Sequence, residues 1–169
     1  MIIGVMSDTH GNRALMHQVA NAMEEGWGVE LIFHLGDDYA DAQELKLFGH
    51  AVYMVPGLQC PEYHGSKVNK RLVKTFHGVS IACTHAEKDL RHTERAASII
   101  LTGHTHVAAI EHIGFSLYMN PGHLKSSWDR GEYPSFGTIT LEDSQVTARI
   151  HELDGVIRFE HTLEREALA

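Results

Sequence analysis

The sequence predicts an α/β fold, a sandwich of two mixed β-sheets with helices on the outside. The first third of the chain alternates short apolar runs with helix-like segments, which is typical of parallel strands joined by right-handed crossovers. The remainder consists mainly of short apolar runs separated by turn signals, which is typical of antiparallel hairpins. With 169 residues, the chain is expected to form one domain over 1–169, with a helix-prone or frayed tail from about residue 160.

The first third is expected to run strand, helix, strand, helix, strand. The apolar run Met1–Met6 predicts a buried strand. Asn12 is a suitable N-cap for a helix over residues 13–25, which Gly26 is expected to end. The next three elements are expected at Val29–Leu35, Ala40–Phe48 and Ala51–Val55.

The second part begins with a predicted hairpin, Arg71–Phe76 and Val79–Cys83, around a His-Gly turn. The polar segment Glu87–Arg95 predicts a helix, and Ser98–Leu101 predicts another buried strand. Further short strands are expected at Val107–His112, Phe115–Met119, Phe136–Leu141, Val146–His151 and Val156–His161.

The composition narrows the possible partners and the compartment. The net charge of −8 argues against nonspecific binding to nucleic acid or to an anionic membrane, but it is compatible with a small anionic substrate bound through a metal. Two cysteines give no disulfide framework. The sequence shows neither a signal peptide nor an apolar run of about 20 residues, so a cytoplasmic protein is expected.

Carboxylate and imidazole side chains stand at the ends of four predicted strands. Binding sites of open α/β sheets form outside the strand carboxyl ends, where loops converge. Carboxylate and imidazole ligands that leave some coordination positions open suit a divalent first-row metal. Each motif alone is weak, because an Asp-x-His pair can cap a turn and a lone histidine can be a hydrogen-bonded loop residue. The motifs are SDTHGN with Asp8 and His10, GDD with Asp37, THAE with His85, and GHTH with His104 and His106.

The order D-x-H, G-D, T-H and G-H-x-H resembles the calcineurin-like metallophosphoesterase superfamily, and most closely its small bacterial and archaeal phosphodiesterase branch. The segments NPG at Asn120–Gly122 and RGEYPSFGTITLED also look like that branch, so the resemblance extends from Met1 to about His151. It implies a four-layer αββα sandwich with a dinuclear metal site at one edge. It also implies phosphodiester hydrolysis by a metal-bridging hydroxide.

The resemblance also implies a set of ligands for two divalent transition-metal ions. Manganese is the expected metal, with zinc or iron as alternatives. No protein side chain matches the family's general acid. The implied ligands are Asp8, His10 and His106 for one ion, Asp37 as the bridge, and His85 and His104 for the second ion.

One expected ligand of the second ion is missing. The family has a Gly-Asn turn after the third strand, and this chain has PGLQC with Leu58 in the asparagine position. Leu58 cannot bind a metal. Gln59, with an amide oxygen on a longer arm, and Cys60, as a thiolate, are possible weak replacements, and a Cys60 ligand would favour zinc or iron.

Other polar residues are given mainly structural roles. Asn12 and His123 are weak candidates for substrate contact, and a helix cap is the preferred interpretation of Asn12. Asp38 and Asp41 are expected to be helix-start charges. Of the remaining histidines, His34 is also considered as a partner behind the metal ligands. All eight are expected at the surface or in hydrogen-bonded loops: His17, His34, His50, His77, His92, His112, His151 and His161.

The expected function is metal-dependent hydrolysis of a small phosphoester, with an altered ligand set for the second metal. The alternative is a catalytically weakened member of the fold that acts as a protein-interaction scaffold, as one retromer subunit of the family does. Six of the seven family ligands are present, which favours the enzyme. Self-association is common in this branch, so a homo-oligomer is also expected.

Overall fold

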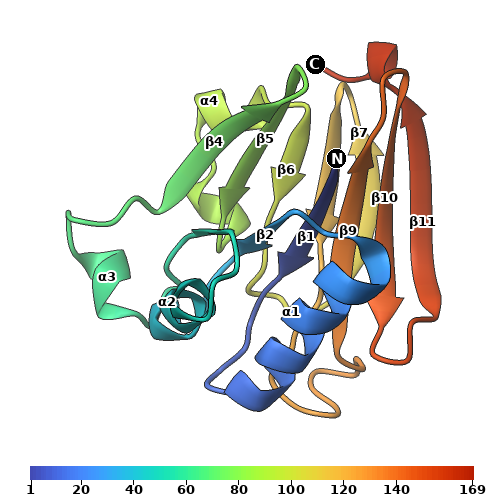
Figure 1. The fold of residues 1–169 in the computed structure, drawn as a ribbon. Helices are drawn as coiled ribbons and strands as arrows, with labels where there is room; N and C mark the ends of the chain where they lie inside the picture. Colours follow the sequence, from blue (N-terminus) through green and yellow to red (C-terminus); the bar gives the residue numbers. More distant parts are fainter.

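The computed structural model describes all residues, 1–169, and contains two mixed β-sheets packed face to face (Figure 1). The first sheet has six strands in the order β11-β10-β9-β1-β2-β3. β1, β2 and β3 are parallel, whereas β9, β10 and β11 continue the sheet in antiparallel pairing. Its strands are β1 (Ile2–Met6), β2 (Leu31–His34), β3 (Val52–Met54), β9 (Ser135–Leu141), β10 (Gln145–Glu152) and β11 (Ile157–Glu164).

The second sheet has five strands in the order β4-β5-β6-β8-β7. β5, β6 and β8 are parallel, and the outer strands β4 and β7 are antiparallel to their neighbours. The predicted α/β sandwich of two mixed sheets is confirmed. The strands are β4 (Arg71–Phe76), β5 (Val79–Thr84), β6 (Ile99–Leu101), β7 (Ala109–Ile113) and β8 (Ser116–Asn120).

The largest apolar cluster fills the space between the two sheets and contains 18 buried residues, including Phe33, Ile81 and Ile139. A second cluster of 13 residues lies between the first sheet and the helices α1 (Arg13–Trp27) and α2 (Tyr39–Leu47). The outer face of the second sheet has only a cluster of four residues. The burial of apolar area in these layers is the main stabilising contribution to the fold.

Helix α1 extends beyond its predicted end. Gly26 was expected to end it, but the helix continues to Trp27, and Gly28 takes the left-handed conformation with φ of 68° and donates to the carbonyl of Met23. Trp27 packs edge-on against Phe136 from β9, with ring centroids 5.3 Å apart. This tertiary contact favours one more helical residue, and the glycine that can adopt positive φ without strain becomes the cap.

The segment Glu87–Arg95 is not the single helix that its composition predicts. It forms a 3-10 turn at Glu87–Asp89 and a separate one-turn helix, α4 (His92–Arg95). The Glu94 carboxylate accepts a hydrogen bond from the backbone N–H of Arg91, so α4 begins with its own N-terminal cap. Leu90 is the only buried apolar side chain between residues 87 and 95, so no apolar stripe stabilises a longer helix.

Two other segments differ from expectation. A one-turn helix, α3 (Pro61–His64), follows β3 in a segment for which no helix is predicted. At the C-terminus, β11 continues to Glu164 and a 3-10 turn covers Arg165–Ala167, after which the N–H of Ala169 donates to the carbonyl of Phe115.

His151 was expected near the surface, and this was wrong. The residue lies on β10, is only 1% exposed, and stacks on Phe136 with ring centroids 5.1 Å apart. Its Nε2 lies 2.8 Å from the hydroxyl of Thr138, and its buried Nδ1 has no hydrogen-bond partner. Burial lowers the pKa of His151 to about 4, with a further contribution from the nearby charge of Arg149.

We expect His151 to make the fold less stable in mild acid. Below the ordinary histidine pKa of about 6.5, the unfolded chain takes up a proton that the folded chain does not bind until about pH 4. The free energy of unfolding should therefore fall by up to about 3 kcal/mol across that range for this residue alone. Urea denaturation at pH 7 and pH 5 should show a smaller pH difference for His151→Phe than for the parent protein. His112→Gln, an exposed control on β7, should keep the full difference.

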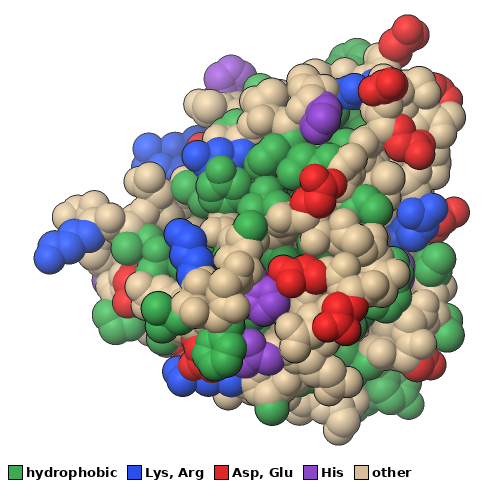
Figure 2. Space-filling model, viewed as in Figure 1, with side chains coloured by type: hydrophobic (Ala, Val, Ile, Leu, Met, Phe, Trp, Pro, Cys, Tyr) green, Lys and Arg blue, Asp and Glu red, His purple; other side chains and the backbone are tan.

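None of the helices is long and apolar enough to cross a membrane. On the face shown in Figure 2, most lysine and arginine side chains lie at the left, and separate acidic side chains are scattered over the right half. This face has no continuous basic surface of the kind that tracks a nucleic-acid backbone.

Candidate metal centre

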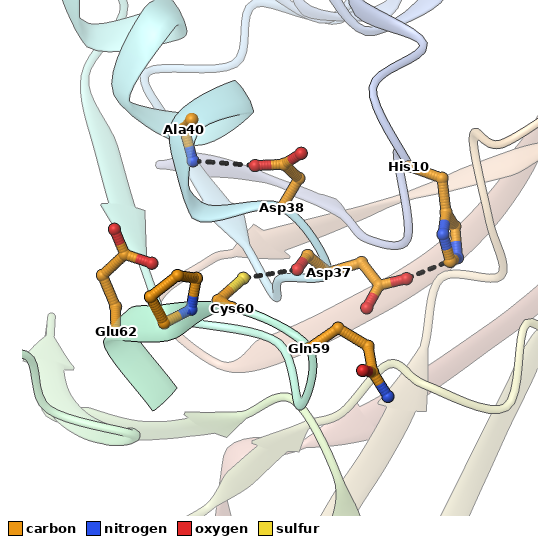
Figure 3. Close-up of a pocket in the computed structure, with 8 residues that line it drawn as sticks. His10, Asp37, Asp38, Ala40, Gln59, Cys60 and Glu62 are labelled. Carbon is orange, nitrogen blue, oxygen red and sulfur yellow. Dashed lines mark hydrogen bonds and ion pairs between the residues drawn. The ribbon is translucent and has the colours of Figure 1, made fainter. Parts of the chain in front are cut away.

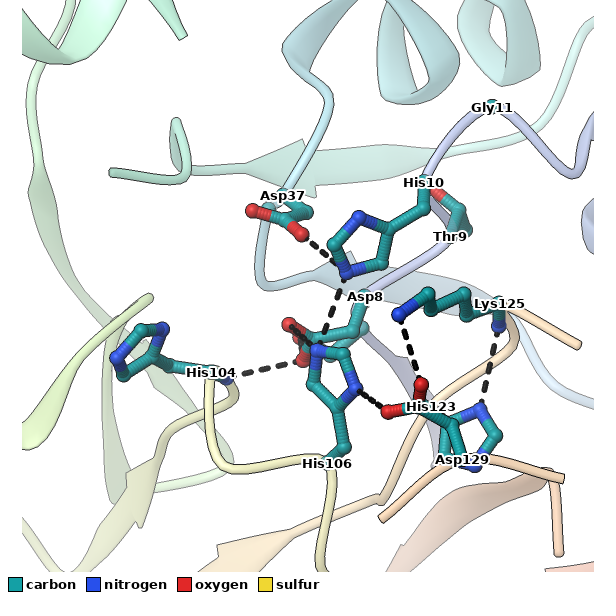
Figure 4. Close-up of polar contacts among 12 residues, drawn as sticks. Asp8, Thr9, His10, Gly11, Asp37, His104, His106, His123, Lys125 and Asp129 are labelled. Carbon is teal, nitrogen blue, oxygen red and sulfur yellow. Dashed lines mark hydrogen bonds and ion pairs between the residues drawn. The ribbon is translucent and has the colours of Figure 1, made fainter. Parts of the chain in front are cut away.

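The six predicted side chains lie in loops that leave the carboxyl ends of four strands at one rim of the sandwich. β1 and β2 are parallel neighbours in the first sheet, and β5 and β6 are parallel neighbours in the second. Their following loops therefore emerge on the same side of each sheet. Figure 4 shows several of these side chains turned toward a common centre. The loops carry Asp8 and His10 after β1, Asp37 after β2, His85 after β5, and His104 and His106 after β6.

The carboxylate of Asp8 is oriented by donors on one oxygen only. Its Oδ2 accepts from the hydroxyl of Ser7 at 2.6 Å and from the backbone N–H of His104 at 2.9 Å. Its Oδ1 is buried, has no hydrogen-bond partner, and lies 3.2 Å from Nε2 of His106. One oxygen thus fixes the orientation of the group and the other remains available to a ligand at the centre.

Four of the side chains form a cluster that could hold an ion. Ligand atoms of Asp8, His10, Asp37 and His106 all lie within 4.8 Å of one another. Nε2 of His10 lies 3.1 Å from Nε2 of His106 and is in direct contact with Oδ2 of Asp37. Carboxylate oxygens and imidazole nitrogens at this separation match the donors that divalent first-row metals take in proteins.

His85 and His104 lie on the other side of Asp37. Nδ1 of the buried His85 donates to the carbonyl of Leu35 at 2.8 Å, which leaves the lone pair on Nε2. That Nε2 has no hydrogen-bond partner and lies 3.7 Å from Oδ1 of Asp37. The ring of His104 lies 5.2 Å from the ring of His85, centroid to centroid. Asp37 is therefore the side chain between the two groups of histidines.

Backbone conformation at the centre is unusual. Asp8, His10, His104 and His106 all have positive φ, between 47° and 70°. Such conformations are uncommon for residues other than glycine and concentrate at functional sites. The surrounding contacts, rather than local preference, hold these four side chains in place.

The electrostatics favour neutral imidazole at two of the histidines. Burial lowers the pKa values of His10 and His104 below the ordinary histidine value, and a neighbouring histidine adds to this effect in each case. Burial also acts to lower the pKa of His106, but its contacts with Asp8 and Asp129 outweigh it and raise the pKa. Burial would raise the pKa of Asp8, and its contacts with His106, His85 and Ser7 bring it below the ordinary value instead.

The donor set fits a metal centre. Two buried acceptor atoms, Oδ1 of Asp8 and Nε2 of His85, have no partner in the protein. Unpaired buried polar atoms are costly, and a bound cation would satisfy both. The combination of carboxylates with imidazoles in the lone-pair form is what a divalent ion requires.

The loop after β3 lies beside the centre but offers no side chain that clearly replaces the missing asparagine. The backbone of Gly57 packs against Asp37 so closely that an added Cβ would lie 2.4 Å from the Asp37 Cα. Gln59 is exposed and lines a cavity with His10 and Asp37 (Figure 3). The thiol of Cys60 donates to the carbonyl of Asp37 at 2.6 Å and accepts from the N–H of Tyr39.

Cys60 is thus a structural residue, contrary to the expectation that it could be a ligand. Burial raises the pKa of its thiol above the usual value, which disfavours the thiolate that a metal requires. The hydrogen bond to the backbone of Asp37 instead connects the β3 loop to the β2 loop.

The two candidates for substrate contact have structural roles. Asn12 caps α1 by accepting from the N–H of Leu15, which agrees with the preferred interpretation, and its amide donates to the carbonyl of Lys125. His123 is fully buried behind His106, and its ring nitrogens face the carbonyl of Glu132 and the N–H of Lys125. No ring nitrogen of His123 is left for a substrate.

The structure adds residues that the sequence did not single out. Asp129 accepts from Nδ1 of His106 at 2.5 Å, and Lys125 donates to its other oxygen. Asp129 comes from an irregular loop far along the chain, so no motif or periodicity could have indicated it.

Asp41 lies in the first turn of α2, as expected of a helix-start charge, and it is also fully buried. Its carboxylate accepts from the Thr9 hydroxyl at 2.6 Å, the Gly11 N–H at 2.9 Å and the Arg13 guanidinium at 3.0 Å. It thereby fixes the loop that carries Asp8 and His10. Asp38, by contrast, caps α2 as expected, accepting from the N–H of Ala40.

His34, which was considered as a residue behind the ligands, is fully buried in β2. Its Nε2 lies 3.5 Å from the Thr9 hydroxyl, and its Nδ1 accepts from the N–H of Gly36 at 3.3 Å. Burial lowers the pKa of His34 to about 4, so the ring is neutral at pH 7. His34 thus contacts Thr9 in the loop after β1 and Gly36 in the loop after β2, which are the loops that carry Asp8, His10 and Asp37.

Comparison with known proteins shows to which family the chain belongs. The model of the calcineurin-like phosphoesterase superfamily domain matches residues 1–144. The probable metallophosphoesterase YsnB of Bacillus subtilis (strain 168) is 27% identical over 165 residues, covering 92% of this chain and 93% of that protein.

Two solved structures share the fold. The phosphoesterase Yfce from E. coli has a TM-score of 0.75 at 19% identity, covering 95% of this chain and 98% of its own. A single mutant of Vps29 from Entamoeba histolytica has a TM-score of 0.74 at 19% identity, covering 97% of this chain and 99% of its own. The resemblance seen in the motifs is confirmed: the chain belongs to the calcineurin-like phosphoesterase superfamily and is a metallophosphoesterase, a hydrolase.

Proposed function

We propose that this protein hydrolyses phosphodiesters at a dinuclear metal centre. The observation that carries the proposal is the pair of buried, unpartnered acceptors near Asp37, namely Oδ1 of Asp8 and Nε2 of His85. One ion would be held by Asp8, His10 and His106, and the second by His85 and His104, with Asp37 shared between them.

The protein's own residues position the reacting groups. When bound, the divalent ions supply Lewis acidity for the phosphoryl oxygens and make water available as a nucleophile at neutral pH. Ser7 and the His104 N–H orient Asp8, and the Leu35 carbonyl selects the His85 tautomer. In the overall reaction, a water oxygen bonds to phosphorus, one phosphorus–oxygen ester bond breaks, and a phosphomonoester, an alcohol and a proton are released.

Manganese is the metal we propose, as the family resemblance implies, and the oxygen and nitrogen donors of this site are ones that manganese, iron and zinc all accept. A thiolate ligand would have favoured zinc or iron, but the Cys60 thiol is engaged with the backbone. The second ion would keep three protein ligands, and the exposed Gln59 amide at the cavity wall is free to approach it.

Metal removal tests the proposal. Dialysis of the purified protein against a chelator should abolish hydrolysis of bis(p-nitrophenyl) phosphate, and Mn²⁺ should restore it. Added Mn²⁺ at about 100 times its Kd should also raise the free energy of unfolding by about 3 kcal/mol. Activity that persists in the metal-free protein would contradict the proposal.

Replacement of Leu58 tests the second ion. The backbone of Gly57 contacts the Gly36-Asp37 segment, so an asparagine at the next position would lie close to the second group of ligands. We expect Leu58→Asn to tighten binding of the second Mn²⁺, measured by calorimetric titration, with little change in the first. Leu58→Gln serves as the control for side-chain polarity at this position. Unchanged binding of both ions in Leu58→Asn would refute this placement of the turn.

The second candidate function is a protein-interaction scaffold. The replacement of the family asparagine by Leu58 favours it, as does a set of large apolar side chains exposed around the start of β11, namely Val156, Ile157 and Phe159. A purified protein that binds no divalent ion and hydrolyses no phosphoester would support this candidate over the enzyme.

A further inference from the structure

A cavity of about 510 Å³ adjoins the candidate metal centre. Its volume suits a small ligand. Figure 3 shows Asp37 between His10 on one side and Glu62 on the other, so the cavity extends from the metal ligands toward α3. The lining residues are His10, Asp37, Asp38, Ala40, Gln59, Cys60, Pro61 and Glu62.

The side chains that line the cavity are mainly acidic. Three carboxylates line it, those of Asp37, Asp38 and Glu62, and no lysine or arginine does. One oxygen of Asp38 accepts from the N–H of Ala40 and so caps α2, and Glu62 is partly exposed. The charge of Arg13 acts on Asp38, and that of Lys125 acts on His10, but neither side chain lines the cavity. Lys67 lines a neighbouring cavity that shares Pro61 and Glu62.

The lining also lacks the features that bind nucleotides. No phenylalanine, tyrosine or tryptophan lines the cavity, so a nucleobase would have no aromatic ring to stack on. Without a basic side chain, a second phosphate would have no charged partner apart from the metals. A cationic group, by contrast, would be attracted by Asp38 and Glu62.

We propose that the substrate is a phosphodiester in which one alcohol carries a positive charge, such as an aminoalkyl or quaternary ammonium alcohol. This inference rests on the proposed phosphodiesterase activity. The phosphoryl group lies at the candidate metal centre, and the cationic alcohol lies in the cavity toward Asp38 and Glu62. Hydrolysis breaks one phosphorus–oxygen ester bond, forms one bond from phosphorus to the water oxygen, and releases the other alcohol with a proton.

Two chromogenic esters with the same leaving group test this preference: p-nitrophenyl phosphorylcholine, whose second alcohol is cationic, and thymidine 5′-(p-nitrophenyl phosphate), whose second alcohol is a nucleoside. With the Mn²⁺-loaded protein, kcat/KM should be at least about tenfold higher for the choline ester, the effect of one partly screened ion pair. An equal or lower value for the choline ester would overturn the inference while leaving the phosphodiesterase activity intact. Hydrolysis of neither ester, nor of bis(p-nitrophenyl) phosphate, would instead overturn the proposed function and this inference with it.

Charge variants of Glu62 assign the preference to the cavity. Glu62→Gln should lower the choline-to-thymidine ratio of kcat/KM several-fold, and Glu62→Lys should bring that ratio below one. Glu25→Lys is the matched control, because it makes the same charge change at an exposed position on α1. A ratio that responds equally to Glu62→Lys and Glu25→Lys would overturn the role of the cavity.

A second inference rests on a different observation, the contacts of Asp129. Its Oδ2 accepts from Nδ1 of His106 at 2.5 Å, and its Oδ1 accepts from Lys125 at 2.7 Å (Figure 4). The adjacent Arg130 donates to the backbone carbonyls of His104 and Thr105 at 3.1 and 3.2 Å. Asp129 therefore holds the side chain of His106, and the adjacent Arg130 holds the backbone of the same GHTH segment.

We infer that Asp129 is a positioning residue for the metal centre. With the Nδ1 proton of His106 directed at Asp129, the lone pair of Nε2 points toward Asp8 and His10. A carboxylate behind a metal-binding histidine fixes its ring orientation and increases its basicity, and loss of such a partner typically weakens metal binding about 10–100-fold.

Calorimetric titration of the metal-free protein with Mn²⁺ tests this role. Asp129→Asn should weaken the tighter site by about 10–100-fold, and Asp129→Glu should recover part of that loss. Lys125→Met, which leaves the His106 contact in place, should have a smaller effect, and it serves if Asp129→Asn does not fold. A purely structural role would lower the melting temperature in chelator without changing Mn²⁺ affinity, and that result would overturn the inference.

Discussion

Asp37→Asn is expected to remove most of the activity of this protein. Asp37 lies against rings of both groups of histidines, in direct contact with Nε2 of His10 and 3.7 Å from Nε2 of His85. Asparagine keeps the size of the side chain but lacks the negative charge that two adjacent cations require. We expect kcat for bis(p-nitrophenyl) phosphate to fall by at least about 10²–10³-fold, the range seen when one preorganised electrostatic group is lost. Metal analysis should also find less than the parent's content of Mn²⁺.

Asp154→Asn is the matched control for this variant. Asp154 is exposed in the turn between β10 and β11 and accepts from the N–H of Val156, which an asparagine can also satisfy. It should therefore retain the parent's activity and metal content. If Asp37→Asn kept full metal content and full kcat, the assignment of Asp37 as the shared ligand would be wrong.

Gly103→Ala should destabilise the folded structure and disturb the candidate metal centre. An added Cβ would lie 2.0 Å from the Ser7 hydroxyl and 2.8 Å from Oδ2 of Asp8. Both atoms belong to the hydrogen bonds that orient Asp8, so relief of the clash must displace them. We expect the free energy of unfolding to fall by about 1–3 kcal/mol or more, measured by urea denaturation. Mn²⁺ affinity should fall as well.

Gly26→Ala is the comparison that isolates this clash. Gly26 lies in α1, is exposed, and has no heavy atom within 4 Å of the position of an added Cβ. Alanine there should raise stability by about 0.5–1 kcal/mol, because it favours the helix. Equal stability and equal metal affinity for Gly103→Ala and the parent would show that the loop after β6 can move away without consequence.

Most of the strands and helices could be predicted from the sequence, because the spacing of apolar residues and the positions of turn residues indicate each element locally. The short apolar runs around Met1–Met6 and Ser98–Leu101 end at polar loops, and the structure has strands at both. The elements that differed depend on tertiary contacts. The packing of Trp27 on Phe136 extends α1 past Gly26, and the lack of an apolar stripe divides the segment Glu87–Arg95.

The residues of the candidate metal centre also divide into those that the sequence could predict and those that it could not. The loops after four strands could be recognised because their ligand-type residues have short, regular spacings and follow apolar runs. Asp129 and Asp41 could not be recognised, because each acts through a partner distant in the sequence, His106 in one case and Thr9 in the other. The environment of Cys60 was also inaccessible, since the hydrogen bond to the Asp37 carbonyl depends on how two loops pack.

The left-handed backbone at Asp8, His10, His104 and His106 has a consequence for how ions exchange with this protein. Because the conformational entropy of these loops is lost when the chain folds, ion entry requires little further ordering. Association should then be limited mainly by dehydration of the cation, and release should proceed without unfolding. The protein would equilibrate readily with whichever divalent ion is abundant around it, so the availability of metals would decide its working cofactor.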